Sequence, residues 1–398
     1  RRSEAEASYR RAVQIKPDYV EVYNNLGGAL KELKRLDEAE ASFRHALQIK
    51  PDYAEALNNL GLTLKDSGRL DEAEASFRHA LLIKPDYAEA LCNLGNTLCE
   101  LDDLTQAAVA YQKALDIAPA GQGLDAAVYL AILRYLDGDF AQCRSALLAS
   151  QAIMATTAPK HDNSRNYWKY LDKLLCRQQQ WNPDDPAREM GALYVIGESH
   201  SLSSHRVVVR YKEREMRCAA EWITGCKQWH LGNDQANKYK HKFEAVMARL
   251  PRESTILLSI GEIDCRHDEG IIKAWKKYPD KTLDEVAQST AASYLNYVAA
   301  IGRRHGHSLI VGGVPASNLP PDTLTASAAG QLVNLIRIFN ATLKSLSLAA
   351  GMDFLDVYAL TDRGDGVASG EWHIDNIHLL PGAMAEAFDR HCLQSGTA

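Results

Sequence analysis

A spacing of 34 residues, repeated through the first third of the chain, restricts its fold more than any other feature of the sequence. Prolines, glycines and aromatic residues each recur at this interval. The prolines are Pro17, Pro51, Pro85 and Pro119; the glycines are Gly27, Gly61 and Gly95; the aromatic residues are Tyr9, Phe43, Phe77 and Tyr111. A fixed period of this length is typical of architectures in which each unit packs only against its neighbours. The sequence therefore predicts an array of stacked units.

The residues of each unit resemble the tetratricopeptide repeat (TPR), which is a helical hairpin. A Leu-Gly pair lies in the first helix of the unit, alanines and an aromatic residue lie in the second, and a proline closes it. Gly61 leaves room for the second helix to approach the first, and Phe77 fills the space between them. Ala73 and Ala80 keep the second helix thin. Pro85 ends that helix because it has no N–H to donate.

The TPR solenoid is predicted to span residues 1–155. It contains a partial repeat, three full repeats and a degenerate terminal unit around residues 124–150, which has helical spacing but no Leu-Gly pair. Such an atypical unit covers the last apolar face of an array. Because the chain starts within a repeat, we expect further repeats upstream.

An asparagine precedes each Leu-Gly pair, at Asn25, Asn59 and Asn93. We expect the three side chains to form a ladder on the concave side, where an amide can pair with both the N–H and the C=O of an extended peptide. The repeats of protein O-GlcNAc transferase use such a ladder, and this array resembles them. Two interpretations stay open: the ladder binds a protein or peptide partner, or the amides only satisfy neighbouring backbone groups.

The repeat pattern stops after residue 155, and a helical linker is predicted over residues 156–188. Trp168, Leu171 and Leu174 have helical spacing, but the segment that follows contains two prolines and few apolar residues. We therefore place the boundary of the second domain close to Arg188.

Residues 189–398 alternate between short apolar runs and segments of helical length. Strands are expected where the runs are rich in Val, Ile and Leu, and helices are expected between them. The strands are 192–197, 254–261, 307–315 and 353–358, and the helices are 235–250, 282–305 and 324–350. This alternation predicts a mainly parallel sheet covered by helices. The predicted fold class is an α-helical solenoid followed by an α/β domain.

Chemically reactive residues follow the predicted strands, at the edge where such sheets collect their functional groups. Ser199 follows the first strand, and Asp375 and His378 form an Asp-x-x-His segment after the last. Nucleophilic acyl transfer requires this set of groups, because a histidine must remove the hydroxyl proton of the serine and an aspartate must orient the imidazole. The spacing places nucleophile and base on neighbouring loops.

This half of the chain resembles the SGNH, or GDSL-like, hydrolases. Their Gly-Asp-Ser block corresponds to Gly197-Glu198-Ser199, and their Asp-x-x-His block corresponds to residues 375–378. The resemblance implies a flavodoxin-like, three-layer α/β fold and a reaction that needs no cofactor. It also implies that Ser199 is the nucleophile, His378 the general base and Asp375 the group that orients the imidazole.

One block departs from the family pattern at a position that holds the oxyanion. The family's Gly-x-Asn-Asp reads Gly261-Glu262-Ile263-Asp264 here, and an isoleucine cannot donate the hydrogen bond of the asparagine. Arg266 is the nearest replacement donor. An ion pair with Glu262 or Asp264 is its alternative role.

The glycine block of the family has no clear counterpart. Gly225 and Gly232 both lie in the expected loop, and we prefer Gly232 as the oxyanion donor because it precedes Asn233 and a helix start. Three acidic residues are expected in the same cleft: Glu198, Glu262 and Asp264.

Two other functions compete with acyl transfer. A scaffold whose sheet domain has lost its activity is favoured by Ile263. A metal-dependent phosphoesterase would use His373, Asp375 and His378 as ligands. However, their spacing differs from the His-Glu-x-x-His pattern, and a metal site leaves Ser199 without a role. We predict a serine esterase or acyltransferase without metal, and the family resemblance suggests that its substrate is an acyl ester such as an O-acetyl group of a glycan or modified protein.

Composition limits the partners and the compartment. With 45 Lys and Arg against 51 Asp and Glu, the net charge is −6, which gives no basic surface for nucleic acid. We expect no membrane span, because no apolar run is long enough. Eight cysteines without a Cys-x-x-Cys pair favour free thiols and a cytoplasmic location.

Overall fold

A computed structural model describes most of the chain. The described residues are 2–118, 123–151, 163–181, 190–223, 225–266, 270–318 and 323–394. The chain divides into two compact units, Arg1–Leu171 and Asp172–Ala398. The division falls inside α11 (Asn163–Trp181), whereas the boundary predicted near Arg188 lies outside the described residues, as does Pro119. No helix among the described residues has the length and apolar character needed to cross a membrane.

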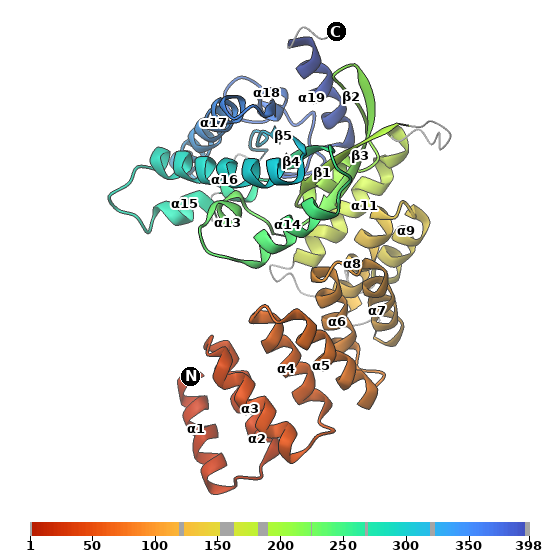
Figure 1. Ribbon diagram of the computed structural model, residues 1–398, viewed down its shortest axis with the longest axis vertical. Helices are drawn as coiled ribbons and strands as arrows, with labels where there is room; N and C mark the ends of the chain where they lie inside the picture. Colours follow the sequence, from red (N-terminus) through yellow and green to blue (C-terminus); the bar gives the residue numbers. More distant parts are fainter. Residues whose placement is uncertain are drawn as a thin grey trace. The chain divides into compact units, whose positions relative to one another are not determined.

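The first unit consists of antiparallel helix pairs that follow one another along the chain (Figure 1). A single helix, α1 (Arg2–Ile15), precedes four pairs. The pairs are α2 (Val20–Glu32) with α3 (Leu36–Ile49), α4 (Ala54–Asp66) with α5 (Leu70–Ile83), α6 (Ala88–Glu100) with α7 (Leu104–Ile117), and α8 (Gly123–Leu136) with α9 (Phe140–Ala149). The three full repeats and the terminal unit of the predicted TPR array are therefore helical hairpins, and the partial repeat is the single helix α1.

Each full repeat packs an aromatic ring directly on a glycine. A Cβ atom added at Gly61 would lie 2.7 Å from the ring of Phe77, and one added at Gly27 would lie 2.7 Å from the ring of Phe43. Gly95 has this relation to the ring of Tyr111. Any larger residue would push the two helices of the hairpin apart, so the recurring glycine fixes their separation.

Arginine side chains on the array surface connect consecutive repeats. Arg69, which directly precedes α5, donates to Glu72 in that helix at 2.6 Å and to Glu40 in the preceding repeat at 2.8 Å. Arg35 makes the equivalent contacts with Glu38 at 2.6 Å and Glu6 at 2.7 Å. Because these groups are partly exposed, each pair contributes only ~0.2 to 1 kcal/mol.

The second unit is built on a six-stranded sheet in the order β2-β3-β1-β4-β5-β6. The strands are β1 (Gly191–Gly197), β2 (Val208–Tyr211), β3 (Arg214–Trp222), β4 (Thr255–Ser259), β5 (Ser308–Gly312) and β6 (Asp353–Leu355). Strands β3, β1, β4, β5 and β6 run parallel, and β2 pairs antiparallel with β3 at one edge. The chain thus begins in the middle of the sheet, adds β3 on one side and then builds the other side. Its topological switch point lies between β1 and β4.

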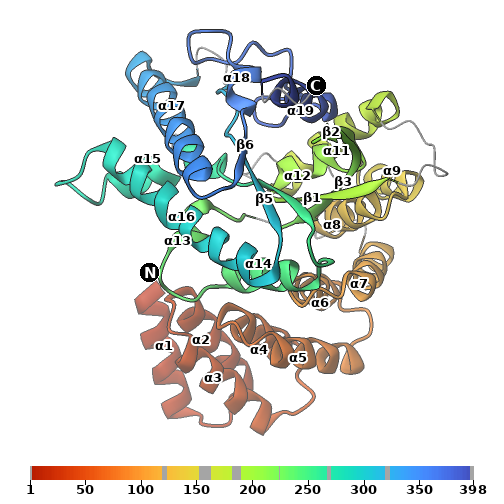
Figure 2. The same cartoon turned by 45° about the horizontal axis from the view of Figure 1, so that its top comes forward.

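Helices cover both faces of this sheet. The second unit contains α12 (Ser199–Ser204), α13 (Gln228–Gly232), α14 (Lys238–Arg249), the 3₁₀ turn η1 (Ile263–Cys265), α15 (Gly270–Trp275), α16 (Leu283–His305), α17 (Ala326–Ala349), α18 (Val357–Thr361) and α19 (Pro381–Gln394). Figure 2 shows α16 and α17 beside β5 and β6. Successive strand residues point to opposite faces, so each strand contributes to two apolar layers.

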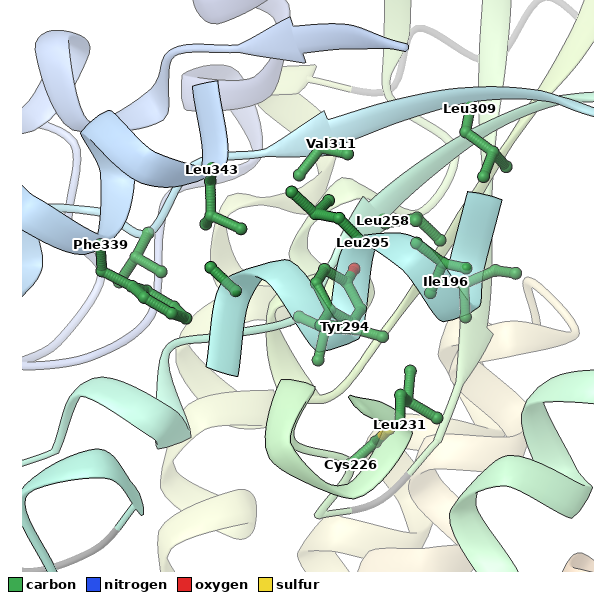
Figure 3. Close-up of a cluster of buried hydrophobic side chains, with 14 of the residues drawn as sticks. Ile196, Cys226, Leu231, Leu258, Tyr294, Leu295, Leu309, Val311, Phe339 and Leu343 are labelled. Carbon is green, nitrogen blue, oxygen red and sulfur yellow. The ribbon is translucent and has the colours of Figure 1, made fainter. Parts of the chain in front are cut away.

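One apolar layer contains Ile196, Leu258 and Val311, which pack against side chains of α13, α16 and α17, including Tyr294 and Phe339 (Figure 3). The opposite layer contains the neighbouring strand residues, which pack against α18 and α19. Its members include Val195, Leu257, Ile310, Leu360 and Phe388. The sheet is therefore buried on both sides, as a mainly parallel sheet requires.

Two strands were not expected from the sequence. β2 and β3 form a hairpin whose two turn residues, Lys212 and Glu213, have φ values of 47° and 63°. Two-residue turns of this kind usually contain Asn or Gly, so Lys-Glu gives no turn signal. Strand β3 is also half-exposed along most of its length and lacks a continuous apolar run. The four predicted strands are present, although the last is shorter than predicted because α18 starts at Val357.

Candidate active site

The predicted functional residues lie at the carboxyl edge of the sheet, beside its switch point. Ser199 is the first residue of α12 and follows β1 after one intervening residue, Glu198. The segment 261–264 follows β4, the neighbour of β1. Asp375 and His378 lie in the loop before α19. Ligands of open α/β sheets bind at this edge and at this point of the strand order.

Ser199, His378 and Asp375 form one continuous chain of hydrogen bonds. The Nε2 of His378 lies 2.8 Å from the Oγ of Ser199, and its Nδ1 lies 2.9 Å from the Oδ2 of Asp375. Ser199 is 2% exposed, and His378 is largely buried. Of the three residues predicted from the sequence as a triad, Ser199 and Asp375 each lie within hydrogen-bonding distance of His378. A histidine held this way carries its proton on Nδ1 and presents Nε2 to the hydroxyl.

The loop holds Asp375 by its second carboxylate oxygen and by its backbone. Its Oδ1 accepts the N–H groups of Ile377 at 2.8 Å and of His378 at 2.7 Å. The side chain of Asn318 donates to the carbonyl of Asp375 at 2.9 Å. Although burial alone would raise it, the hydrogen bonds from His378 and Ile377 hold the pKa of Asp375 well below its usual value. The carboxylate is thus kept charged beside the imidazole.

Glu198 makes direct contact with the serine. Its Oε2 accepts the backbone N–H of Ser199 at 2.5 Å and also the hydroxyl of Ser199. The sequence placed Glu198 in the cleft but gave no sign of this contact, because the corresponding family residue is a shorter aspartate. One carboxylate oxygen therefore engages both donors of the candidate nucleophile.

Two further histidines lie next to the triad. His200 is 7% exposed, and its Nε2 donates to the carbonyl of Ile377 at 3.0 Å. Burial and the nearby His378 lower the pKa of His200. Burial and the nearby His200 lower the pKa of His373 to about 4. Both rings are neutral near pH 7, so they line the triad without adding positive charge.

The segment after β4 is oriented toward the protein interior. Ile263 is 7% exposed, and Asp264 is fully buried. The carboxylate of Asp264 accepts the backbone N–H of Gln228 at 2.6 Å and of Trp229 at 3.2 Å, at the start of α13. Burial outweighs these bonds and raises the pKa of Asp264 to about 7. Asp264 therefore holds the start of α13.

Arg266 takes the alternative role that the sequence left open. Its guanidinium makes a bidentate contact with Glu262, with an Nε–Oε1 distance of 2.9 Å and an Nη2–Oε2 distance of 2.7 Å. This pairing directs the donors of Arg266 to Glu262. Its role as the replacement oxyanion donor therefore stays a prediction without a contact to support it.

The structure gives Gly232 a packing role. A Cβ atom there would lie 2.8 Å from the backbone nitrogen of Tyr294, so the glycine permits α13 to pack closely on α16. Gly225 has a φ of 68°, which favours glycine. Both features explain the two glycines by backbone geometry. The contacts described for Gly232 do not connect it to Ser199.

A small internal cavity adjoins the site. His200, Ser203 and Glu262 contribute polar groups to its wall, and Leu257 and Leu379 are among the apolar residues there. Ser199 is not one of the lining residues. The cavity is thus a space next to the triad rather than an opening onto the serine.

The residues of the alternative metal site, His373, Asp375 and His378, are not arranged as metal ligands. Asp375 and His378 are hydrogen-bonded directly to each other rather than directed at a common point. Among the described residues, no group of three or more His, Cys, Asp or Glu side chains has an arrangement that would hold a metal ion.

The asparagines of the array link consecutive repeats. Asn59 donates to the side chain of Asn24 at 2.9 Å, and Asn93 donates to Asn58 at 2.9 Å. Asn59 and Asn93 are half-buried, whereas Asn25 is exposed. The ladder therefore makes contacts within the protein, and part of its surface also faces solvent.

Comparisons with known proteins identify the repeats. The tetratricopeptide repeat family matches residues 18–84 and 52–120, so the N-terminal part is a TPR array. Similar solved structures include MamA (19% identity, covering 37% of this chain and 85% of that chain, TM-score 0.34). Another is PilF of Pseudomonas aeruginosa (19% identity, covering 45% of this chain and 86% of that chain, TM-score 0.38). A third is YrrB, described as a TPR protein with an unusual peptide-binding site (17% identity, covering 43% of this chain and 84% of that chain, TM-score 0.36). No curated protein matches the chain.

Proposed function

We propose that the α/β domain is a serine esterase or acyltransferase of the SGNH type. The observation that carries this proposal is the hydrogen-bond chain from the Oγ of Ser199 through His378 to Asp375, with distances of 2.8 and 2.9 Å. The order of the five parallel strands is that of flavodoxin-like folds, which agrees with the fold that the resemblance implies. The three side chains come from two loops at the same sheet edge.

The geometry supports a two-step reaction through an acyl-enzyme. His378 accepts the hydroxyl proton of Ser199 while Oγ forms a bond to the acyl carbon. The ester C–O bond then breaks, and His378 returns the proton to the leaving alcohol. Water or a second hydroxyl attacks the acyl-enzyme by the same route, which releases an acid or a new ester. Asp375 stabilises the imidazolium in both steps.

The substrate class follows from the family resemblance. We infer an acyl ester, such as an O-acetyl group on a glycan or a modified protein. A TPR array in the same chain suits recruitment of a protein or peptide that carries the ester. The half-buried Asn59 and Asn93 and the exposed Asn25 supply amide groups for such a partner.

A non-catalytic binding domain is the second candidate. This candidate is favoured by the two residues expected to bind the oxyanion, because the side chain of Ile263 has no donor group and Arg266 is paired with Glu262. Loss of one oxyanion donor reduces transition-state stabilisation by ~3 to 4 kcal/mol in a known serine protease. A domain with this deficit would bind an ester without turning it over at a measurable rate.

Hydrolysis of p-nitrophenyl acetate and labelling by a fluorophosphonate distinguish the two candidates. We expect turnover and labelling by the native chain, and loss of both by at least ~10³-fold in Ser199→Ala and His378→Ala. Circular dichroism would establish that the variants stay folded. Equal rates in the native chain and both folded variants, or an unlabelled native serine, would favour the binding domain.

A further inference from the structure

Both donors of Ser199 are directed to a single oxygen of Glu198. The Oε2 of Glu198 accepts the backbone N–H of Ser199 at 2.5 Å and also accepts its hydroxyl. Ser199 is 2% exposed, whereas Glu198 is only half-buried. The carboxylate that contacts both donors is therefore more exposed than the serine itself.

The position of this oxygen corresponds to that of a reacting carbonyl oxygen. In acyl transfer, the acyl carbon bonds to Oγ, and the oxyanion attached to that carbon needs donors at about 2.7 to 3.1 Å. The N–H of Ser199 is the backbone donor nearest to Oγ. A negatively charged oxygen that contacts both this N–H and Oγ fills the place of the oxyanion and has the same charge.

The contact also directs the hydroxyl proton away from the base. Oγ carries one proton, which can be donated either to Glu198 or to the Nε2 of His378, 2.8 Å away. Activation of the nucleophile requires donation to His378. The bond to Glu198 therefore opposes activation as long as the carboxylate stays in place.

Two residues considered as oxyanion donors do not supply a replacement for the N–H of Ser199 in the contacts described. The side chain of Ile263 has no donor group, and the guanidinium of Arg266 is paired with Glu262. Reaction thus depends on freeing the N–H that Glu198 engages.

We propose that Glu198 occupies the oxyanion position in the resting protein and that the acyl substrate displaces it. This inference rests on the proposed acyl-transfer function. It makes Glu198 a residue that touches the reacting atoms and selects among substrates. Esters with further contacts to the protein displace the carboxylate, whereas small esters without such contacts react slowly.

The test compares fluorophosphonate labelling rates in the full chain. In this reaction, Oγ of Ser199 bonds to phosphorus, the P–F bond breaks, fluoride leaves and the hydroxyl proton passes to His378. Glu198→Ala removes the carboxylate. Glu198→Asp keeps the negative charge and places a residue that is favoured at helix starts. Its side chain is one methylene shorter, so the carboxylate oxygen is withdrawn from Ser199. We expect both variants to be labelled roughly tenfold faster than the native chain, the order expected for one charge-assisted hydrogen bond.

Glu285→Ala is the matched control. Its carboxylate accepts the N–H of Thr282 at 2.7 Å and the hydroxyl of Thr282 at 3.0 Å, which is the same pair of contacts at a helix start away from the triad. We expect its labelling rate to equal that of the native chain. Thermal unfolding of each variant would correct for loss of folded protein.

The outcomes separate this inference from the proposed function. Faster labelling of both Glu198 variants, with Glu285→Ala unchanged, supports displacement. Labelling of the native chain that is equal to or faster than that of folded Glu198→Ala and Glu198→Asp overturns the inference but leaves the acyl-transfer function intact. If the native chain and all variants stay unlabelled, the proposed function fails and the inference fails with it.

Discussion

The two units of this chain obtain their order in opposite ways. In the array, the contact that sets the helix spacing joins Gly61 to Phe77 within one hairpin, and the same contact recurs in the repeats on either side. In the α/β domain, the central contact joins Ser199 to His378, which are 179 residues apart, and it occurs once. The array is therefore built from local contacts that neighbouring repeats duplicate, whereas the domain depends on single contacts between distant segments.

Polar groups follow the same division. The array places its ion pairs on the surface, where those of Arg35 and Arg69 bridge neighbouring repeats. The α/β domain buries ionisable groups such as Asp264 and His200 and thereby shifts their pKa values. Perturbed groups of this kind gather at functional sites. The comparison teaches that repetition duplicates surface ion pairs along the array and that long-range packing buries ionisable side chains in the α/β domain.

The largest expected effect concerns the unique contact. Asp375→Asn should reduce the rate of ester hydrolysis by ~10³- to 10⁴-fold, because an amide favours the wrong tautomer of His378 and does not stabilise the imidazolium. Rates of p-nitrophenyl acetate hydrolysis would measure this loss, and circular dichroism would show whether the variant stays folded. A loss smaller than tenfold would contradict the role assigned to Asp375.

Removal of a buried ring tests whether damage is local or global. Phe77 and Phe243 are both fully buried, and each change to Ala should reduce the stability of its surroundings by ~3 to 5 kcal/mol. Because the array is quasi-one-dimensional, Phe77→Ala should increase hydrogen exchange mainly in α4 and α5 and their neighbours. Phe243→Ala should increase exchange throughout the α/β domain. Uniform exchange across the array in Phe77→Ala would break the comparison.

The buried Asp264 predicts a pH dependence confined to the α/β domain. Its pKa is raised from 3.8 to about 7, so its protonated form stabilises the folded state. That stabilisation is complete below pH 3.8 and is lost as the pH rises through about 7. Relative to Asp264→Asn, the native chain should lose ~4 kcal/mol of unfolding free energy between pH 4 and 8.

Urea unfolding followed by tryptophan fluorescence would measure this loss. Five of the six tryptophans lie in the second unit, and the sixth, Trp168, donates to the carbonyl of Leu147 in α9, so the signal comes mainly from the second unit. Parallel pH profiles of the two proteins would show that Asp264 does not titrate as expected.

The smallest effect separates ligand binding from packing in the array. Asn59→Ala and Asn93→Ala should each lower the stability of the array by ~0.5 to 1.5 kcal/mol, because each breaks a hydrogen bond between repeats. Asn25→Ala, at an exposed position, should leave stability unchanged. Far-UV circular dichroism and partner capture from a lysate would be compared. If Asn25→Ala captures partners as well as the native chain does, the ladder is structural.

The sequence predicted the repeats well because each contact that defines them is written within 34 residues. The same reasoning located the four apolar strands and brought Ser199 together with Asp375 and His378 through the family blocks. It missed β2 and β3, because Lys212 and Glu213 adopt turn geometry without turn residues and β3 is half-exposed. It also missed the contact between Glu198 and Ser199, which depends on side-chain length. Gly232 stays a predicted oxyanion donor, because its close packing on Tyr294 shows only that a glycine required by helix packing resembles one required by a binding loop.

The ring that rests on a glycine in each repeat also limits how the length of the array can change. In each unit, a pair such as Gly27 and Phe43 sets the separation of the two helices, and this contact does not depend on any other unit. Insertion or deletion of one whole period leaves every remaining pair in register. A change of any other size between a glycine and its ring displaces the ring from that glycine. The array can therefore gain or lose reach only in steps of one hairpin, and the α/β domain has no comparable unit of length.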